Sequence, residues 1–261
     1  MKFFLLVLLC STGLVAETVQ LPKGIDHRAY DSLLGKYVDD QGLVDYQGWK
    51  ASSADMGILK EYLKQFGPTG NPASGEEEIA GLLNAYNAFT LNMILENYPT
   101  NSIRLLDDPF KRKAHLMGGR KVSLDEIEQD TLRPLIGWNV HALVVCAARS
   151  CPPLASEGFS ADTWEDQMQE RYRVWFARED LTEFAMDSNR VEISKIFDWY
   201  KKDFEGDDSI KNILLRFGPE SKQAFLSEET YKVIYKTYHW GLNDQSDVGK
   251  DYKHSIFKLF F

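Results

Sequence analysis

The strongest constraint on the fold is a long apolar segment, residues 76–97, whose composition predicts one long helix. Three glutamates at residues 76–78 suit the positive end of a helix dipole, and Pro99 ends the segment. Asn84 and Asn87 interrupt it at i and i+3, so they share one face of the helix. Asparagine is a poor helix former, and buried amides need hydrogen-bond partners. We expect both side chains to staple a neighbouring loop; the alternative is that they line a pocket.

Shorter elements are predicted around this helix. Helices are predicted at residues 26–37, 51–66, 123–135, 160–179, 194–203 and 207–216. Hairpins are predicted at residues 38–46 and 115–122, a strand at 190–193 and a β-like stretch at 233–239. Ser123 and Glu126 form a capping box that opens one of the helices.

The run from His141 to Ala148 is continuous, apolar and rich in valine. Its length and flanking breaks favour a buried central strand over a helix. The chain has no internal repeats, low-complexity segments or clear linker. The sequence therefore predicts a single α+β domain, helix-rich around a small mixed or antiparallel sheet.

The first sixteen residues have the layout of a secretory signal peptide. Lys2 gives a positive start, residues 3–9 are apolar, and a small polar segment ends at Ala16. The apolar stretch is too short to cross a bilayer, which takes roughly 20 residues. We expect residues 17–261 to form an exported, periplasmic or secreted domain with no integral membrane segment. The alternative, a lipid anchor at Cys10, is disfavoured by the bulky Leu9.

Composition limits the partners. A net charge of −9 argues against nucleic acid, whose phosphates require a basic surface. The five histidines are scattered without the spacing of a metal site, so no metal is predicted. No glycine-rich phosphate loop and no Gly-x-Ser-x-Gly motif occurs, and no cofactor is expected. A peptide, a glycan or a protein of the cell envelope remains as a partner.

Removal of the signal peptide leaves two cysteines, Cys146 and Cys151. An exported compartment permits a disulfide between them. Alternatively, Cys146 is buried in the predicted strand and Cys151 is reactive, because Pro152 suits a helix start and Arg149 favours a thiolate. A nucleophilic cysteine also needs a base, usually histidine. His141 is nearest in sequence but roughly 30 Å away along an extended chain, so the chain would have to fold back.

Several motifs in order resemble one family. They are LNAYNAFT (83–90), NYP (97–99), VSLDEIE (122–128), HALVVCAA (141–148), SCPPL (150–154) and SKIFDWY (194–200). Together they are similar to the domain of unknown function 547 family of bacteria and plants, over roughly residues 40–240. Gln129 departs from the pattern, which often has histidine there.

This family has no settled activity. The resemblance implies a fold related to papain-like and transglutaminase-like enzymes, in which a helix carries a nucleophilic cysteine and a strand carries a histidine. On that analogy His141 would be the base, and the helix position of the nucleophile holds Asn84 instead of cysteine. Fold analogy alone does not transfer an activity.

Two functions follow from these residues, and the sequence leaves open whether the protein is an enzyme. The first is a catalytically silent envelope module that binds its partner through a pocket, with contacts from aromatic residues such as Trp138, Trp164, Trp199 and Trp240. The alternative is a cysteine-dependent hydrolase or acyl-transferase, in which Cys151 attacks a peptide or amide carbonyl and His141 transfers the proton. In that mechanism Asn84 or Asn87 would orient the imidazole or stabilise the oxyanion.

Overall fold

Helix α4 (Glu76–Asn97) runs through the core, and almost every side chain from Ala80 to Leu95 is buried. A helix that is apolar on all sides needs neighbours on all sides. In the computed structural model, which describes residues 18–253, α2, α3 and α5 pack against it. The helix has the bounds predicted from the sequence. The predicted signal peptide, residues 1–16, lies outside the described residues.

The remaining helices are mostly short. They are α1 (Arg28–Tyr37), α2 (Tyr46–Ala51), α3 (Ser53–Lys64), α5 (Leu124–Ile127), α6 (Arg133–Ile136), α7 (Trp164–Ala177), α8 (Ile196–Trp199), α9 (Ile210–Phe217) and α10 (Gln223–Ser227). The predicted capping box of Ser123 and Glu126 is present at the start of α5. A π-helical turn, Glu128–Leu132, joins α5 to α6 where the sequence predicted one continuous helix.

Two small sheets complete the fold. Strands β1 (His115–Met117) and β2 (Arg120–Val122) form the predicted hairpin, with Gly118 and Gly119 at positive φ in the turn. Strands β3 (Glu183–Ala185), β4 (Arg190–Ile193) and β5 (Lys232–Tyr235) form a mixed sheet in which β5 lies at an edge. The predicted α+β class, helix-rich around small sheets, is confirmed.

The predicted central strand at residues 141–148 is wrong. Residues Gly137–Ala142 form a 3-10 helix, and the chain after them is irregular, with Ala147 at a φ of 58°. The apolar run is buried as expected, but its backbone bonds to the side chain of Asn87 on α4 and, at Ala147, to the amide of Asn243, and an isolated bridge between Ala148 and Leu242 takes the place of a regular strand. Burial alone does not distinguish a strand from an irregular segment that has such partners.

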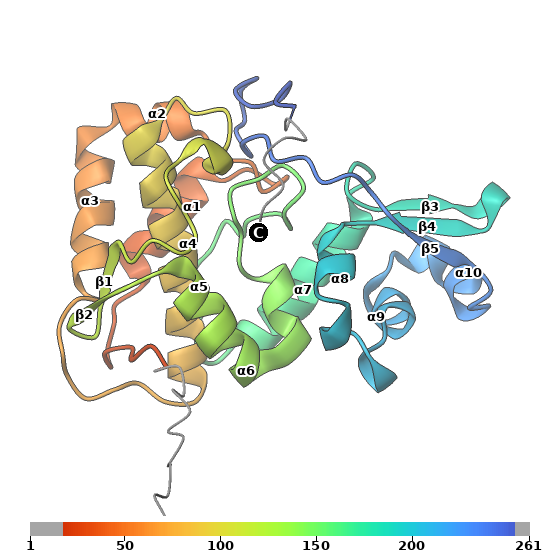
Figure 1. The fold of residues 1–261 in the computed structure, drawn as a ribbon, viewed down its shortest axis with the longest axis horizontal. Helices are drawn as coiled ribbons and strands as arrows, with labels where there is room; N and C mark the ends of the chain where they lie inside the picture. Colours follow the sequence, from red (N-terminus) through yellow and green to blue (C-terminus); the bar gives the residue numbers. More distant parts are fainter. Residues whose placement is uncertain (1–17, 254–261) are drawn as a thin grey trace, which may run out of the picture.

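Figure 1 shows helices α1–α4 gathered on one side and the sheet β3–β5 with α9 and α10 on the other. Elements α5 to α8 lie between these two groups. None of the helices within residues 18–253 combines the length and apolar character that a membrane crossing needs.

Candidate functional site

A pocket of about 600 Å³ opens where four parts of the chain meet. These four parts, the α5–α6 region, residues 141–151, α8 with the residues beside it and residues 235–240, are joined by Tyr86 of α4 and by the loop at residues 104–111. Most of its side chains are aromatic or charged: Tyr86, Arg104, Phe110, Lys111, Asp125, Glu128, Lys195, Trp199, Tyr200, Tyr235, Lys236, Tyr238 and Trp240. His141, Cys146 and Cys151 line the same pocket.

Three rings form one wall, which we call the aromatic wall: Trp199, Tyr238 and Trp240. The ring of Tyr238 lies 4.8 Å from that of Trp199 and 4.7 Å from that of Trp240, measured between centroids. Trp199 remains 39% exposed, unusual for a large apolar side chain, and the Arg104 guanidinium lies 4.8 Å from the Trp240 ring. Partly exposed aromatic side chains in a pocket are typical ligand contacts.

Glu128 places a buried carboxyl group in the pocket. Its Oε1 accepts a hydrogen bond of 2.8 Å from Gln129, and the hydroxyls of Tyr86 and Tyr200 also bond to it. Burial raises the pKa of Glu128 to about 7 in spite of these bonds. The group therefore exchanges a proton near neutral pH. Our sequence analysis missed it, although it stands at i+4 from Leu124, on the buried stripe of the helix.

His141 is bonded to Asp203, and Arg133 holds Asp203 in turn. Its Nε2 lies 2.7 Å from Oδ2 of Asp203, and Arg133 donates to both oxygens of that carboxylate at 2.6 and 2.7 Å. Burial lowers the pKa of His141 and so favours its neutral ring. Burial would raise the pKa of Asp203, but the bonds from His141 and Arg133 outweigh it and lower that pKa. The sequence analysis found His141 and missed Asp203.

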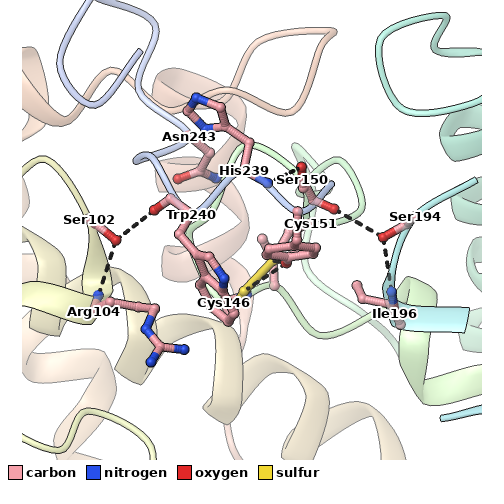
Figure 2. The surroundings of a disulfide bond; sticks show 12 residues. Ser102, Arg104, Cys146, Ser150, Cys151, Ser194, Ile196, His239, Trp240 and Asn243 are labelled. Carbon is pink, nitrogen blue, oxygen red and sulfur yellow. Dashed lines mark hydrogen bonds between the residues drawn. A yellow bond between two sulfur atoms is a disulfide. The ribbon is translucent and has the colours of Figure 1, made fainter. Parts of the chain in front are cut away.

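The two cysteines form a disulfide, with their Cα atoms 6.4 Å apart (Figure 2). The chain does fold back, because His141 and both cysteines line one pocket. Cys151 is only 4% exposed, and no helix begins beside it, since α7 starts at Trp164. The predicted helix start after Cys151 is therefore wrong, and a bridged Cys151 has no thiol with which to attack a carbonyl.

Asn84 and Asn87 staple two loops to α4, the structural role we expected. Asn84 exchanges two hydrogen bonds of 2.8 Å with the backbone of Phe159. Asn87 donates to the carbonyl of Leu143 at 2.8 Å and accepts from the amide of Val145 at 2.9 Å. Neither asparagine is part of the pocket lining. The structure brings His141 and Cys151 to the pocket and leaves the two asparagines outside its lining.

The part of the chain that the structure describes contains no group of three histidine, cysteine or acidic side chains placed to hold a metal ion. The charged lining instead combines four cations with two acids. Burial raises the pKa of Asp125 and raises that of Glu128 to about 7, so the negative charge of Glu128 is weakened near neutral pH.

Comparison with known proteins gives a family and no activity. Residues 71–175 match the model of a family described as "Protein of unknown function, DUF547". The match contains Glu128, His141 and both cysteines, whereas Asp203 and the aromatic wall lie beyond it. No curated protein and no solved structure matches the chain. Through residues 71–175, with their stapled helix and pocket-lining segment, the chain is similar to the DUF547 family.

Proposed function

We propose that this protein is an exported binding module that holds an extended, acidic peptide in the pocket against the aromatic wall. The observation that carries the proposal is the pairing of a partly exposed aromatic wall with a pocket of about 600 Å³. A pocket of this size suits a short segment of a ligand, and aromatic side chains contribute much of the binding free energy at such sites.

A peptide is favoured over a glycan by the strand beside the pocket. Strand β5 is an edge strand, and the chain that continues from it, residues 235–238, lines the pocket. The amides of Lys232 and Lys236 bond back across the sheet, to the carbonyls of Asn189 and Ile193. In a parallel pair alternate residues face the neighbour, so residues 233 and 235 direct their backbone groups to the open edge. An extended peptide can add to such an edge as a further strand.

The charges of the lining favour an acidic ligand. Arg104, Lys111, Lys195 and Lys236 line the pocket, against two acids whose pKa values are raised by burial. Opposite charges at a binding site speed the encounter and select the partner.

Export is supported by two independent features. The apolar stretch at residues 3–9 has the layout of a signal peptide. The disulfide between Cys146 and Cys151 belongs to the kind of bond that persists in oxidising compartments such as the periplasm or the extracellular space. We therefore place the binding module outside the cytoplasm.

The cysteine hydrolase considered from the sequence loses support at its first step. The nucleophile in that mechanism is the thiolate of Cys151, and the disulfide occupies its sulfur. His141 is in addition bonded to Asp203, and the two asparagines are occupied with backbone groups. We propose the binding module without acyl transfer.

The test uses arrays of random-sequence peptides and of oligosaccharides, probed with the purified protein. We expect binding to peptides rich in Asp, Glu and aromatic residues. Trp199→Ala should weaken that binding about tenfold, which corresponds to about 1.4 kcal/mol. Leu135→Ala is the control, because Leu135 is 49% exposed and outside the pocket lining. Circular dichroism of both variants checks that they fold.

Binding that is unchanged by Trp199→Ala would show that the peptide uses another surface, and the proposal would fall. Binding of oligosaccharides alone, lost in Trp199→Ala, would keep the pocket as the binding site but replace the ligand class.

A further inference from the structure

We propose that the Cys146–Cys151 disulfide exchanges with the thiols of a bound peptide, so that the protein oxidises a peptide dithiol to a disulfide. The inference rests on the proposed peptide binding and names the chemistry of the ligand, a peptide with two cysteines. It starts from the position of the disulfide, because both cysteines line the pocket that holds the aromatic wall.

The two sulfurs differ in access. Cys146 is half-buried, whereas Cys151 is only 4% exposed. Thiol–disulfide exchange begins with attack of a thiolate on one sulfur along an open approach. Attack at Cys146 is therefore favoured, and Cys151 becomes the leaving group.

The surroundings of Cys151 suit a leaving thiolate. The backbone amide of Cys146 donates to its sulfur at 3.2 Å, and the Tyr238 hydroxyl lies 3.1 Å from the same atom and 3.3 Å from the sulfur of Cys146. The sulfurs of a disulfide carry no hydrogen, so the hydroxyl is the donor. Burial raises the pKa of Tyr238, which keeps its proton in place. Hydrogen bonds to a developing anion are stronger than those to a neutral acceptor. The amide therefore favours departure of Cys151, and the hydroxyl, within reach of both sulfurs, can donate to the Cys151 thiolate once it forms.

The loop that carries the sulfurs is held without the disulfide (Figure 2). The amide of Arg149 donates to the carbonyl of Gly241 at 2.8 Å, and the amide of Asn243 donates to the carbonyl of Ala147 at 3.0 Å. The amide of His239 donates to the hydroxyl of Ser150 at 2.8 Å. These bonds keep the two sulfurs close together after the S–S bond breaks, so the protein remains folded in its dithiol form.

The exchange balances with the peptide dithiol as the reductant. One peptide thiolate attacks Sγ of Cys146, the S–S bond of the protein breaks, and its electron pair leaves on the sulfur of Cys151. The second peptide thiol loses its proton to solvent and attacks the peptide sulfur of the mixed disulfide, which releases Cys146 as a thiolate. Both protein thiolates take protons from solvent. The peptide loses two electrons and two protons, and the protein gains them in a single stoichiometric turnover.

The first experiment traps the mixed disulfide. Each single cysteine variant is mixed with an acidic peptide whose single cysteine is held in a disulfide with thionitrobenzoate, and adducts are read by intact mass. In Cys151→Ser the accessible Cys146 attacks and no resolving thiol remains, so a peptide adduct should accumulate. In Cys146→Ser the buried Cys151 should form at least about tenfold less adduct. Equal adducts at the two cysteines would overturn the assigned roles, and no adduct in either would overturn the exchange.

The second experiment keeps both cysteines. The oxidised wild-type protein is mixed with the reduced acidic peptide, and the rate of peptide disulfide formation is measured by mass after acid quenching. Tyr238→Phe should slow this rate at least about tenfold, because the leaving thiolate loses a hydrogen bond. Tyr231→Phe is the matched control, since Tyr231 is buried and its hydroxyl has no hydrogen-bond partner in the structure. An equal rate in both variants would contradict the role of Tyr238.

Failure of the exchange can be told apart from failure of the binding. If the reduced peptide binds and stays a dithiol, the exchange is wrong and the binding module stands. If the peptide neither binds nor is oxidised, while the oxidised protein reacts with free cysteine only at Cys146, the binding module is wrong and the disulfide keeps its directional reactivity toward small thiols.

Discussion

The segment from Gly137 to Phe159 faces α4 on one side and the pocket on the other, and the polar groups on these two sides differ in how they are paired. On the side of α4, Asn84 and Asn87 close hydrogen bonds with the backbone of the segment. On the pocket side, His141 and the disulfide share a cavity with Glu128, whose pKa is raised to about 7. Polar groups that are fully paired stabilise a fold, whereas titratable groups held at a shifted pKa in a pocket are typical of ligand or reaction sites. The stapled side stabilises the fold, and the pocket side is where we expect function.

The largest effect is expected on the stapled side. Asn87→Ala removes the partners of the Leu143 carbonyl and the Val145 amide, which are both buried. Each unpaired buried group costs about 1–3 kcal/mol, so the free energy of unfolding should fall by about 4 kcal/mol. Urea denaturation followed by circular dichroism measures this loss.

Asn97→Ala provides the control for that measurement. Asn97 bonds to the carbonyl of Met93 within the same helix and is exposed near its end. Its loss should cost less than about 1 kcal/mol. Similar losses for the two variants would show that the staple contributes no more than an ordinary helix-end contact.

The contrast between the two sides also explains how much of the fold was predictable. Helix α4 was predicted from end to end, because three glutamates, a continuous apolar stretch and Pro99 act locally. The segment at residues 141–148 was predicted as a strand because its run of valines is local too. Two of its actual bonds, from Leu143 and Val145 to the side-chain amide of Asn87 on α4, span 56 and 58 positions of the sequence. Periodicity carries no information about such partners.

The candidate site divides in the same way. His141 and Cys151 were found by residue type, since histidine and cysteine carry recognisable chemistry. Asp203 and Tyr238 were missed, because they meet these residues across 62 and 87 positions of the sequence. An aspartate and a tyrosine are ordinary surface or core residues until the fold gives them a partner.

The second effect is expected at Glu128 on the pocket side, where a substitution should raise the free energy of unfolding rather than lower it. Because the pKa of Glu128 is raised from 4.5 to about 7, the folded chain binds more protons than the unfolded chain in this range. The stability due to this group is therefore present below pH 4.5 and is lost as the pH rises through about 7. Glu128→Gln removes the ionisation and should raise the free energy of unfolding by about 3 kcal/mol at pH 8, with no gain at pH 4.

Urea denaturation of Glu128→Gln and wild type at both pH values measures that difference. His141 titrates in both proteins, so its contribution cancels. A loss of stability at pH 8 would mean that the bonds from Gln129, Tyr86 and Tyr200 stabilise the ionised carboxylate more than burial destabilises it. Glu128 would then stabilise the fold, as Asn84 and Asn87 do.

The smallest effect on stability is expected at the charged lining. Lys195 pairs with Asp198 at 2.6 Å, with both side chains more than a third exposed, so Lys195→Gln should cost less than about 0.5 kcal/mol. The same change should weaken binding of an acidic peptide severalfold at low salt and less at high salt, because salt screens the lost attraction. Lys64→Gln is the matched control. It breaks an i,i+3 pair with Glu61 of the same 2.6 Å length, on a lysine outside the pocket lining. Calorimetric titration at two salt concentrations separates the two lysines: equal affinities for both variants would show that the pocket cations do not select the ligand.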